Sequence, residues 1–223
     1  MIDSEALVNR GFVVVPRLIE PGECAALAGL WPDPAPFRKK VIMQRHGYGQ
    51  GEYQYFTYPL PRPVERLRQA LYPELAAVAN RWNDLLGRVR RFPPTLERWL
   101  GECRKGGQNR ATPLLLRYGP GDYNCLHRDL YGELVFPLQA TVLLSEPGRD
   151  FDGGEFMLVE QRPRMQSRGE VVPLGRGDAV IFAVNERPAR GARGWHRTAM
   201  RHGVSSLRRG ERFTLGIIFH DAA

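Results

Sequence analysis

Short apolar segments alternate with glycine-containing turns from Pro113 to the end of the chain, and this spacing constrains the fold most strongly. The turns contain Gly-Pro-Gly at 119–121, Gly-Gly at 153–154 and Gly-Arg-Gly at 175–177, and the segments between them have the length of β-strands. Seven or eight strands of this kind are typical of a double-sheet jelly roll or cupin-like barrel. We therefore predict a mainly β chain whose core, residues 113–223, is a double-stranded β-helix.

Residues 1–112 follow a different pattern, with one short apolar run at 11–16 and several segments at helical spacing. Apolar side chains recur every three or four residues between Val64 and Gly87. Pro73 interrupts this segment and lacks a backbone donor, so we expect two helices, or a second helix that begins near the proline. Residues 1–112 are predicted to be a support region of helices and strand, joined to the core in one integrated domain.

Residues 44–58 combine glycines with the tyrosines Tyr48, Tyr53 and Tyr55. Glycine gives a permissive backbone, and tyrosine offers a flat face on which a base or a planar side chain can stack. One interpretation is a substrate lid at the mouth of the barrel. The other is a plain β-hairpin whose aromatic side chains are buried.

His127 and Asp129 form an H-x-D pair in the segment 124–129. In an extended segment the two side chains point the same way, so both can bind one metal ion. Two imidazoles and one carboxylate suit non-haem Fe(II) and leave coordination positions open. His202 is the leading candidate for the third ligand. His196, six residues earlier, would share its face on a regular strand.

Arg212 follows His202 by ten residues. Its planar donor fork is suited to a free carboxylate, although a surface arginine in a basic tail is the simpler interpretation. Alternation along a strand would place Thr214 and Gly216 on the same face as Arg212. That face combines a cation, a hydroxyl and a position without a side chain.

Together, the H-x-D pair, the distal histidine and the arginine ten residues later resemble the Fe(II)/2-oxoglutarate-dependent oxygenases. The tail from His202 to Ala222 is most similar to their prolyl-hydroxylase-like branch. The resemblance implies that His127, Asp129 and His202 are the catalytic iron ligands, and it favours His202 over His196. It also implies that Arg212 and Thr214 bind 2-oxoglutarate, with further hydrogen bonds from Tyr118 and Gln139. The implied reaction hydroxylates a C–H bond while O2 and 2-oxoglutarate become succinate and CO2, with ascorbate as an optional reductant.

Segments 45–55 and 161–168 resemble a bacterial family of oxygenases that is predicted to demethylate damaged nucleic acid oxidatively. The chain carries 32 Lys and Arg against 24 Asp and Glu, a net charge of +8, which favours an acidic partner. Eight arginines lie between 187 and 212, where they could clamp phosphates or simply solvate a loop. The expected partner is single-stranded or damaged nucleic acid, and the candidate substrate residues are Tyr48, Tyr53, Tyr55, Arg193, His196 and Arg197.

Two alternatives to this substrate remain open. The similarity of the tail to protein hydroxylases favours a protein or amino-acid side chain, and a basic cupin-like binding protein would need no chemistry at all. Mutation of His127 would leave such a binder functional. Because the chain has no long apolar run, no signal-peptide pattern at its first residues and only three widely spaced cysteines, we expect a cytoplasmic protein without a membrane partner.

Overall fold

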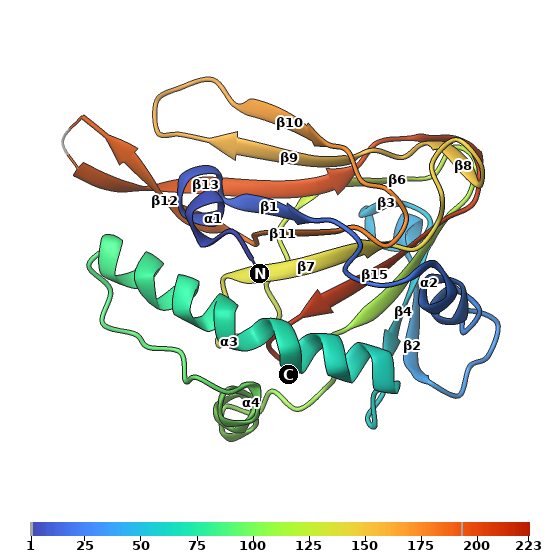
Figure 1. The fold of residues 1–223 in the computed structure, drawn as a ribbon, viewed down its shortest axis with the longest axis horizontal. Coiled ribbons are helices and arrows are strands. Elements are labelled where there is room, and N and C mark those ends of the chain that lie inside the picture. The colour runs from blue at the N-terminus through green and yellow to red at the C-terminus, as the bar shows by residue number, and fades with distance from the viewer. Residues whose placement is uncertain (1, 193) are drawn as a thin grey trace.

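Two antiparallel β-sheets face each other in the computed structural model, which describes residues 2–192 and 194–223 (Figure 1). The larger sheet contains, in spatial order, β1 (Phe12–Val15), β11 (Ala179–Ala183), β7 (Leu138–Leu143), β15 (Arg212–Ile218), β5 (Leu114–Tyr118), β4 (Glu52–Phe56) and β2 (Phe37–Ile42). The smaller sheet contains β10 (Arg168–Val172), β9 (Phe156–Gln161), β13 (Gly194–Val204), β6 (Tyr123–His127) and β3 (Gly49–Gln50), and β12 (Glu186–Gly191) pairs with β13. A third pair joins β14 (Leu207–Gly210) to β8 (Phe151–Gly153). This is the double-sheet arrangement that the spacing of turns predicts.

Helices cover the outer side of the larger sheet, and the longest of them lies across it (Figure 1). They are α1 (Ser4–Arg10), α2 (Pro21–Ala28), α3 (Arg62–Leu85) and α4 (Leu96–Lys105), with a 3-10 turn, η1, at Met43–His46. The apolar face of α3 is buried in the same cluster as the sheet residues beneath it. Burial of this face drives helix formation more strongly than intrinsic propensity does.

The expectation of a break at Pro73 is wrong, because α3 is one helix with the proline inside it. A proline inside a helix costs about 3 kcal/mol. Leu71, Tyr72 and Leu75, on either side of it, are all buried. Full burial of such side chains contributes about 1.5–3 kcal/mol each, so packing on the sheet outweighs the cost of the proline.

The first half of the chain supplies three strands of the larger sheet. Phe12 of β1 pairs with Phe182 of β11, and Tyr55 of β4 pairs with Leu114 of β5. The segment 44–58 therefore runs from η1 through β3 in one sheet to β4 in the other. Residues 1–112 and 113–223 share their sheets and their core.

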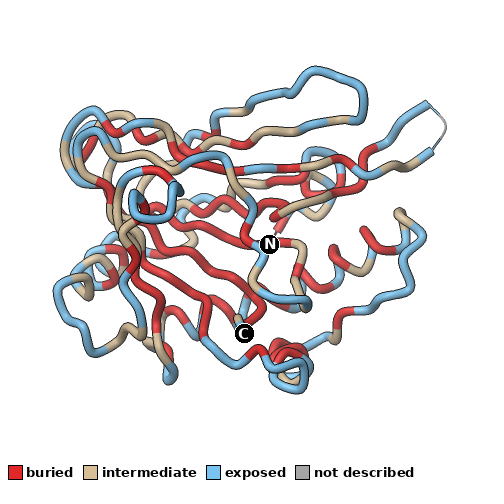
Figure 2. The backbone as a smooth tube through the Cα atoms, turned by 180° about the vertical axis from the view of Figure 1, so that it is seen from behind, coloured by how far each residue is buried: buried red, intermediate tan, exposed pale blue. Residues whose placement is uncertain are grey.

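The interior between the sheets is apolar at one end and polar at the other. The rings of Phe156 and Phe182 lie 5.0 Å apart, and that of Phe182 lies 4.7 Å from the ring of His202. The central strands β11, β7 and β15 of the larger sheet are buried along most of their length, whereas the turn that joins β9 to β10 is exposed (Figure 2). The apolar packing ends at His202, where a cavity begins.

Candidate metal and 2-oxoglutarate site

A cavity of about 500 Å³ opens between the two sheets. Its walls come from β4, β5, β7 and β15 of the larger sheet and from β6 and β13 of the smaller one. The volume lies within the range of about 300–1,000 Å³ that is usual for small-molecule sites. All the iron-site and 2-oxoglutarate residues expected from the sequence line this one cavity: His127, Asp129, His202, Arg212, Thr214, Tyr118 and Gln139.

The three expected metal ligands converge at the middle of the cavity. One ligand atom from each of His127, Asp129 and His202 lies within 4.8 Å of the other two. The two carboxylate oxygens of Asp129 face different histidines, with Oδ1 3.4 Å from Nε2 of His127 and Oδ2 3.2 Å from Nε2 of His202. Nδ1 of His127 is 2.7 Å from the carbonyl oxygen of Cys125, which accepts its hydrogen and leaves Nε2 for a metal.

Strand pairing brings these ligands together from distant parts of the chain. His202 of β13 lies opposite His127, the last residue of β6, and Asp129 follows just beyond the strand. Gly203 allows the close approach, since an added Cβ there would lie 2.7 Å from the carbonyl oxygen of Asn124. The pairing thus fixes the distance between the two imidazoles before any metal binds.

Two neighbouring side chains orient the carboxylate of Asp129. The Tyr131 hydroxyl donates to Oδ1 at 2.8 Å, and Nε2 of Gln139 donates to Oδ2 at 2.8 Å. Partners of this kind hold metal ligands in position and tune their affinity. Sequence reasoning missed Tyr131, although its place two residues after Asp129 puts it on the same side of an extended segment.

Mutual interactions set the charge of the cluster. Burial raises the pKa of Asp129, but hydrogen bonds from His127 and His202 outweigh it and hold that pKa well below its usual range. Burial also works against protonation of His127, yet the carboxylate of Asp129 raises its pKa overall. Burial, followed by the charge of His127, lowers the pKa of His202. The site therefore presents an ionised carboxylate beside a neutral His202, as a divalent metal requires.

Arg212 lies at the deep end of the cavity, and its side chain is about 1% exposed. Its Nε and Nη1 have no hydrogen-bond partner among the described residues, and none of those residues places a carboxylate within 4.0 Å of it. Burial lowers the pKa of Arg212 to about 10, so it remains a cation at neutral pH. A buried cation without a partner is costly, and an anion that fills the cavity would relieve that cost.

Polar groups around Arg212 complete an anion site. The Tyr118 ring lies 5.6 Å from the Arg212 guanidinium carbon, and burial raises the pKa of Tyr118 to about 12. Tyr118 is therefore a neutral hydroxyl, which accepts a hydrogen bond from Asn124 at 3.5 Å and keeps its own hydrogen for a ligand. Thr214 lines the same end of the cavity. These donors fit the carboxylate of a small dicarboxylic acid, while Asp129 and the two histidines fit Fe(II).

The mouth of the cavity combines tyrosines and cations. Tyr48 is 50% exposed there, and its ring stacks on His46 with centroids 5.3 Å apart. Tyr53 and Tyr55 belong to β4 and form part of the wall. Four basic residues that sequence reasoning did not select also line this opening, namely Arg38, Lys39, Arg110 and Arg128. They are separated by up to 90 positions in the sequence, and no local motif joins them.

The structure does not bring His196 and Arg197 to the cavity. Both lie near the start of β13, six and five residues before His202, and each strand residue adds about 3.3 Å. They are therefore about 15–20 Å from the metal cluster, where Arg197 faces Glu186 at 3.8 Å. Neither residue lines the cavity, so their contact with a substrate stays a prediction, and Arg193 lies outside the described residues.

The chain is similar in fold to several 2-oxoglutarate–Fe(II) oxygenases of solved structure. It matches a prolyl-4-hydroxylase of Pseudomonas putida with a TM-score of 0.57 and 16% identity, over 96% of this chain and 94% of the other. An oxidoreductase of the 2OG-Fe(II) oxygenase family from Burkholderia pseudomallei matches with a TM-score of 0.54 and 18% identity, over 99% and 91%. At this identity the likeness establishes the fold, and the predicted jelly roll is confirmed.

The chain belongs to the family described as "Oxygenase, catalysing oxidative methylation of damaged DNA", whose model matches residues 51–222. It is also 53% identical to an uncharacterised protein of Mycobacterium tuberculosis, over 75% of this chain and 72% of the relative. The predicted oxygenase class is confirmed. Family, fold and donor set together support Fe(II) and 2-oxoglutarate as its cofactor and co-substrate. No helix among the described residues has the length and apolar character needed to span a membrane.

Proposed function

We propose that this protein is an Fe(II)/2-oxoglutarate dioxygenase that oxidatively demethylates an alkylated base in single-stranded or damaged nucleic acid. One observation carries the chemistry. A cluster of two histidines and a carboxylate shares a cavity with a buried, unpaired arginine, so a metal and a carboxylate ligand fit side by side. The description of the family supports the choice of substrate.

His127, Asp129 and His202 would hold the metal, and Tyr131 and Gln139 would keep the carboxylate of Asp129 in place. Bound Fe(II) supplies the chemistry that couples O2 and 2-oxoglutarate to oxidation of a C–H bond. The protein excludes water from one side of the cluster, where Phe156 and Phe182 are fully packed. Exclusion of water protects the reaction from competing pathways.

Arg212 would pair with the distal carboxylate of 2-oxoglutarate. Thr214 and the Tyr118 hydroxyl line the same end of the cavity and would donate to its oxygens. Such charge-assisted hydrogen bonds are roughly twice as strong as neutral ones, and they orient a planar carboxylate. The co-substrate is thereby directed so that its other end lies toward the metal ligands.

An N-methyl group on a base is a suitable target for this oxidation. Insertion of one oxygen atom into its C–H bond gives a hydroxymethyl group, while the other oxygen atom of O2 enters succinate as CO2 leaves. The hydroxymethyl carbon then departs as formaldehyde and the proton returns to the base nitrogen. Oxygen insertion therefore removes a methyl group. Tyr48 at the mouth provides a face on which the base can stack.

A second candidate is hydroxylation of a protein or amino-acid side chain. The solved structures of similar fold include a prolyl hydroxylase in complex with a peptide fragment from Trichoplax adhaerens, with a TM-score of 0.55 and 13% identity. The exposed part of the region 44–58, its 3-10 turn and Tyr48, would then face the peptide as a lid. The same iron and 2-oxoglutarate residues serve both candidates.

Substrate-dependent succinate formation distinguishes these candidates. We expect iron-loaded protein to release succinate and formaldehyde in equal amounts with a single-stranded oligonucleotide that carries N-methylated bases. The unmethylated oligonucleotide is the control. Succinate formed with a proline-rich peptide, and none with the methylated oligonucleotide, would replace the first candidate by the second.

A further inference from the structure

We propose that Arg38, Lys39, Arg110 and Arg128, called here the rim cations, bind the phosphodiester backbone of a single-stranded nucleic acid at the mouth of the cavity. This inference rests on the proposed function and identifies the surface that recognises its substrate. The basic cluster between 187 and 201 is not part of this surface, since His196 and Arg197 lie far from the cavity.

The rim cations come from three separate parts of the fold and meet at one opening. Arg38 and Lys39 lie on β2, the edge strand of the larger sheet. Arg110 lies just before β5, where its backbone bridges to Ala222. Arg128 lies between the two ligands of the H-x-D pair. All four line the cavity that contains the metal cluster, so an anion bound by them would be next to its entrance.

Two neighbouring lysines on β2 differ in whether they have a carboxylate partner, according to the face of the strand on which they lie. Lys39 pairs in register with Tyr55, a cavity residue, and so lies on the cavity side. Lys40 points the other way and forms an ion pair with Glu52 at 2.9 Å. Lys40, outside the cavity, therefore has a carboxylate partner, whereas Lys39, inside it, has none within 4.0 Å among the described residues.

The other rim cations also lack a carboxylate within 4.0 Å in the described part of the chain, unlike many arginines elsewhere. Arg187 is paired with Glu160 and Arg117 with Glu211, for example. Burial lowers the pKa of Arg38, and the positive charge of Arg110 also acts to lower it. Like charges held together without a counter-ion favour the binding of an anion.

Arg38 is held in a fixed position that leaves part of its donor fork free. Its Nε donates to the carbonyl oxygen of Ala111 at 2.9 Å, and its guanidinium lies 4.6 Å above the Tyr55 ring. Its Nη groups make no hydrogen bond with the described residues. A side chain that is already ordered loses less entropy on binding, and a free guanidinium edge matches two phosphate oxygens.

The aromatic pair of His46 and Tyr48 makes a polynucleotide a better fit than an acidic peptide. The two rings are stacked, with planes 21° apart, at the same mouth as the rim cations. Alternating cations and flat rings are the usual features of single-strand binding sites. A base within a duplex would have to leave the stack to reach a cavity between two sheets, so a single strand binds with less cost.

The salt dependence of binding tests the rim. We would measure fluorescence anisotropy of a short labelled oligothymidylate with protein loaded with Fe(II) and 2-oxoglutarate under anaerobic conditions. For single strands, each phosphate contact contributes about 0.7 to the slope of log affinity against log salt. The double variant Lys39→Gln/Arg110→Gln removes two phosphate contacts, so the slope of log affinity against log salt should become shallower by roughly 1.4. Its binding at low salt should be about 10-fold weaker or more.

Two matched variants control for the loss of charge alone. Lys40→Gln removes the adjacent lysine on the other face of β2, and Arg190→Gln/Arg201→Gln removes two exposed arginines outside the cavity. Both should keep the wild-type slope. Equal slopes for Lys39→Gln/Arg110→Gln and Arg190→Gln/Arg201→Gln would overturn the inference, because they would show non-specific attraction only.

Two further outcomes separate this inference from the proposed function. Wild-type protein that binds Fe(II) and 2-oxoglutarate but no oligothymidylate at low salt would overturn the rim and leave the chemistry in place. Failure to bind Fe(II) and 2-oxoglutarate would instead contradict the proposed function. A polyglutamate peptide that competes as well as the oligonucleotide would contradict the assignment to nucleic acid.

Discussion

The two ends of the cavity hold positive charge in different ways. At the deep end, a single guanidinium, that of Arg212, is about 1% exposed and surrounded by fixed donors. At the mouth, the rim cations are exposed, with the exception of the half-buried Arg38. A buried cation selects one small anion of defined shape, whereas exposed cations attract a long anion with a strength that depends on salt. On the proposed function, the deep end would hold the co-substrate in a fixed position and the mouth would bind a more variable substrate.

Of the substitutions at the cavity, loss of a metal ligand should have the largest effect. His202→Ala is expected to lower metal affinity by more than about 100-fold, since even the partners of metal ligands contribute about 10–100-fold. His196→Ala is the matched control, because it removes a histidine from the same strand about 20 Å away. Isothermal titration with Ni(II) would measure both. Equal losses of metal affinity in His202→Ala and His196→Ala would show that the cluster is not the metal site.

Removal of the deep cation should separate ligand binding from stability. Arg212→Met is expected to weaken the binding of 2-oxoglutarate about 30- to 4,000-fold, since truncation of a buried charge pair costs about 2–5 kcal/mol. The ligand-free protein should melt at the same temperature or higher, because an unpaired buried charge is removed. Arg209→Met, which breaks an exposed pair with Asp152, is the control. A lower melting temperature for Arg212→Met would mean that the guanidinium is part of the core's stabilisation.

Loss of the hydroxyl of Tyr131 should have a smaller effect, confined to the metal. Tyr131→Phe removes the donor to Oδ1 of Asp129 but retains the ring. Metal affinity should fall about 10- to 100-fold, with 2-oxoglutarate affinity of the fully metal-loaded protein unchanged. Tyr53→Phe, on the same wall without a contact to Asp129, is the comparison. Identical metal affinities for Tyr131→Phe and Tyr53→Phe would show that the Tyr131 hydroxyl does not support the metal site.

Mild acid should act on the fold before it acts on either end of the cavity. Burial, with the charge of Arg68 adding to it, lowers the pKa of His220 to about 4, and Nδ1 of this histidine accepts from the amide of Phe136. The unfolded state therefore takes up the proton first, and stability present above pH 6.5 is lost as the pH falls towards 4. The loss is on the order of 3 kcal/mol. His220→Asn should remove much of this loss of stability, measured as the difference in unfolding free energy between a pH above 6.5 and a pH near 4. If that difference is the same in the variant and the wild type, another group causes the loss.

Sequence patterns predicted most of the polar residues that line the middle and the deep end of the cavity, but none of the rim cations at its mouth. His127 and Asp129 are two residues apart, and Arg212 and Thr214 alternate along one strand, so local geometry predicts which side chains share a face. The rim cations come from residues 38–39, 110 and 128. The pairing of β2 with β4 and of β4 with β5 brings the first two of these parts together, and Arg128 follows β6 of the other sheet.

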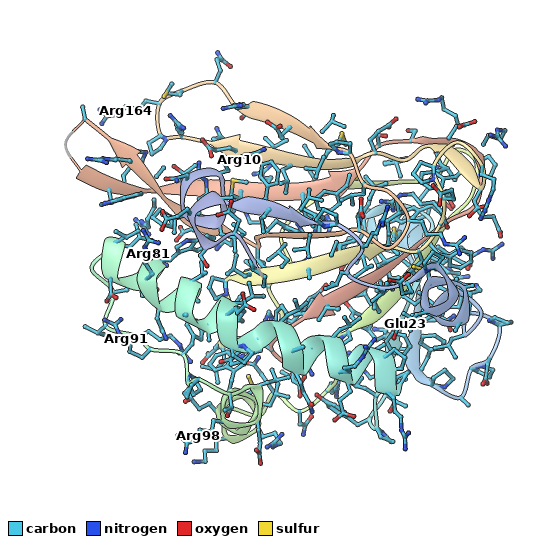
Figure 3. All side chains as sticks on the ribbon, viewed as in Figure 1. Arg10, Glu23, Arg81, Arg91, Arg98 and Arg164 are labelled. Carbon is cyan, nitrogen blue, oxygen red and sulfur yellow. The ribbon has the colours of Figure 1, made fainter. Side chains whose placement is uncertain are left out.

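The described arginines that cluster along the chain at residues 187–201 do not line the cavity. Long strands carry such a cluster away from the site, and β13 alone has 11 residues. Figure 3 shows that basic side chains such as Arg91, Arg98 and Arg164 project from several outer edges of the molecule. Density of charge along the sequence therefore does not show which cations lie beside the cavity.

The central claim is that one cavity holds Fe(II) and 2-oxoglutarate together. Anaerobic titration of the purified protein with Fe(II) and then 2-oxoglutarate tests it through the weak visible charge-transfer band of the chelate. We predict the band in the wild type, its loss in His202→Ala and its weakening in Arg212→Met. No band in the metal-loaded wild type, or an undiminished band in His202→Ala, would contradict the account.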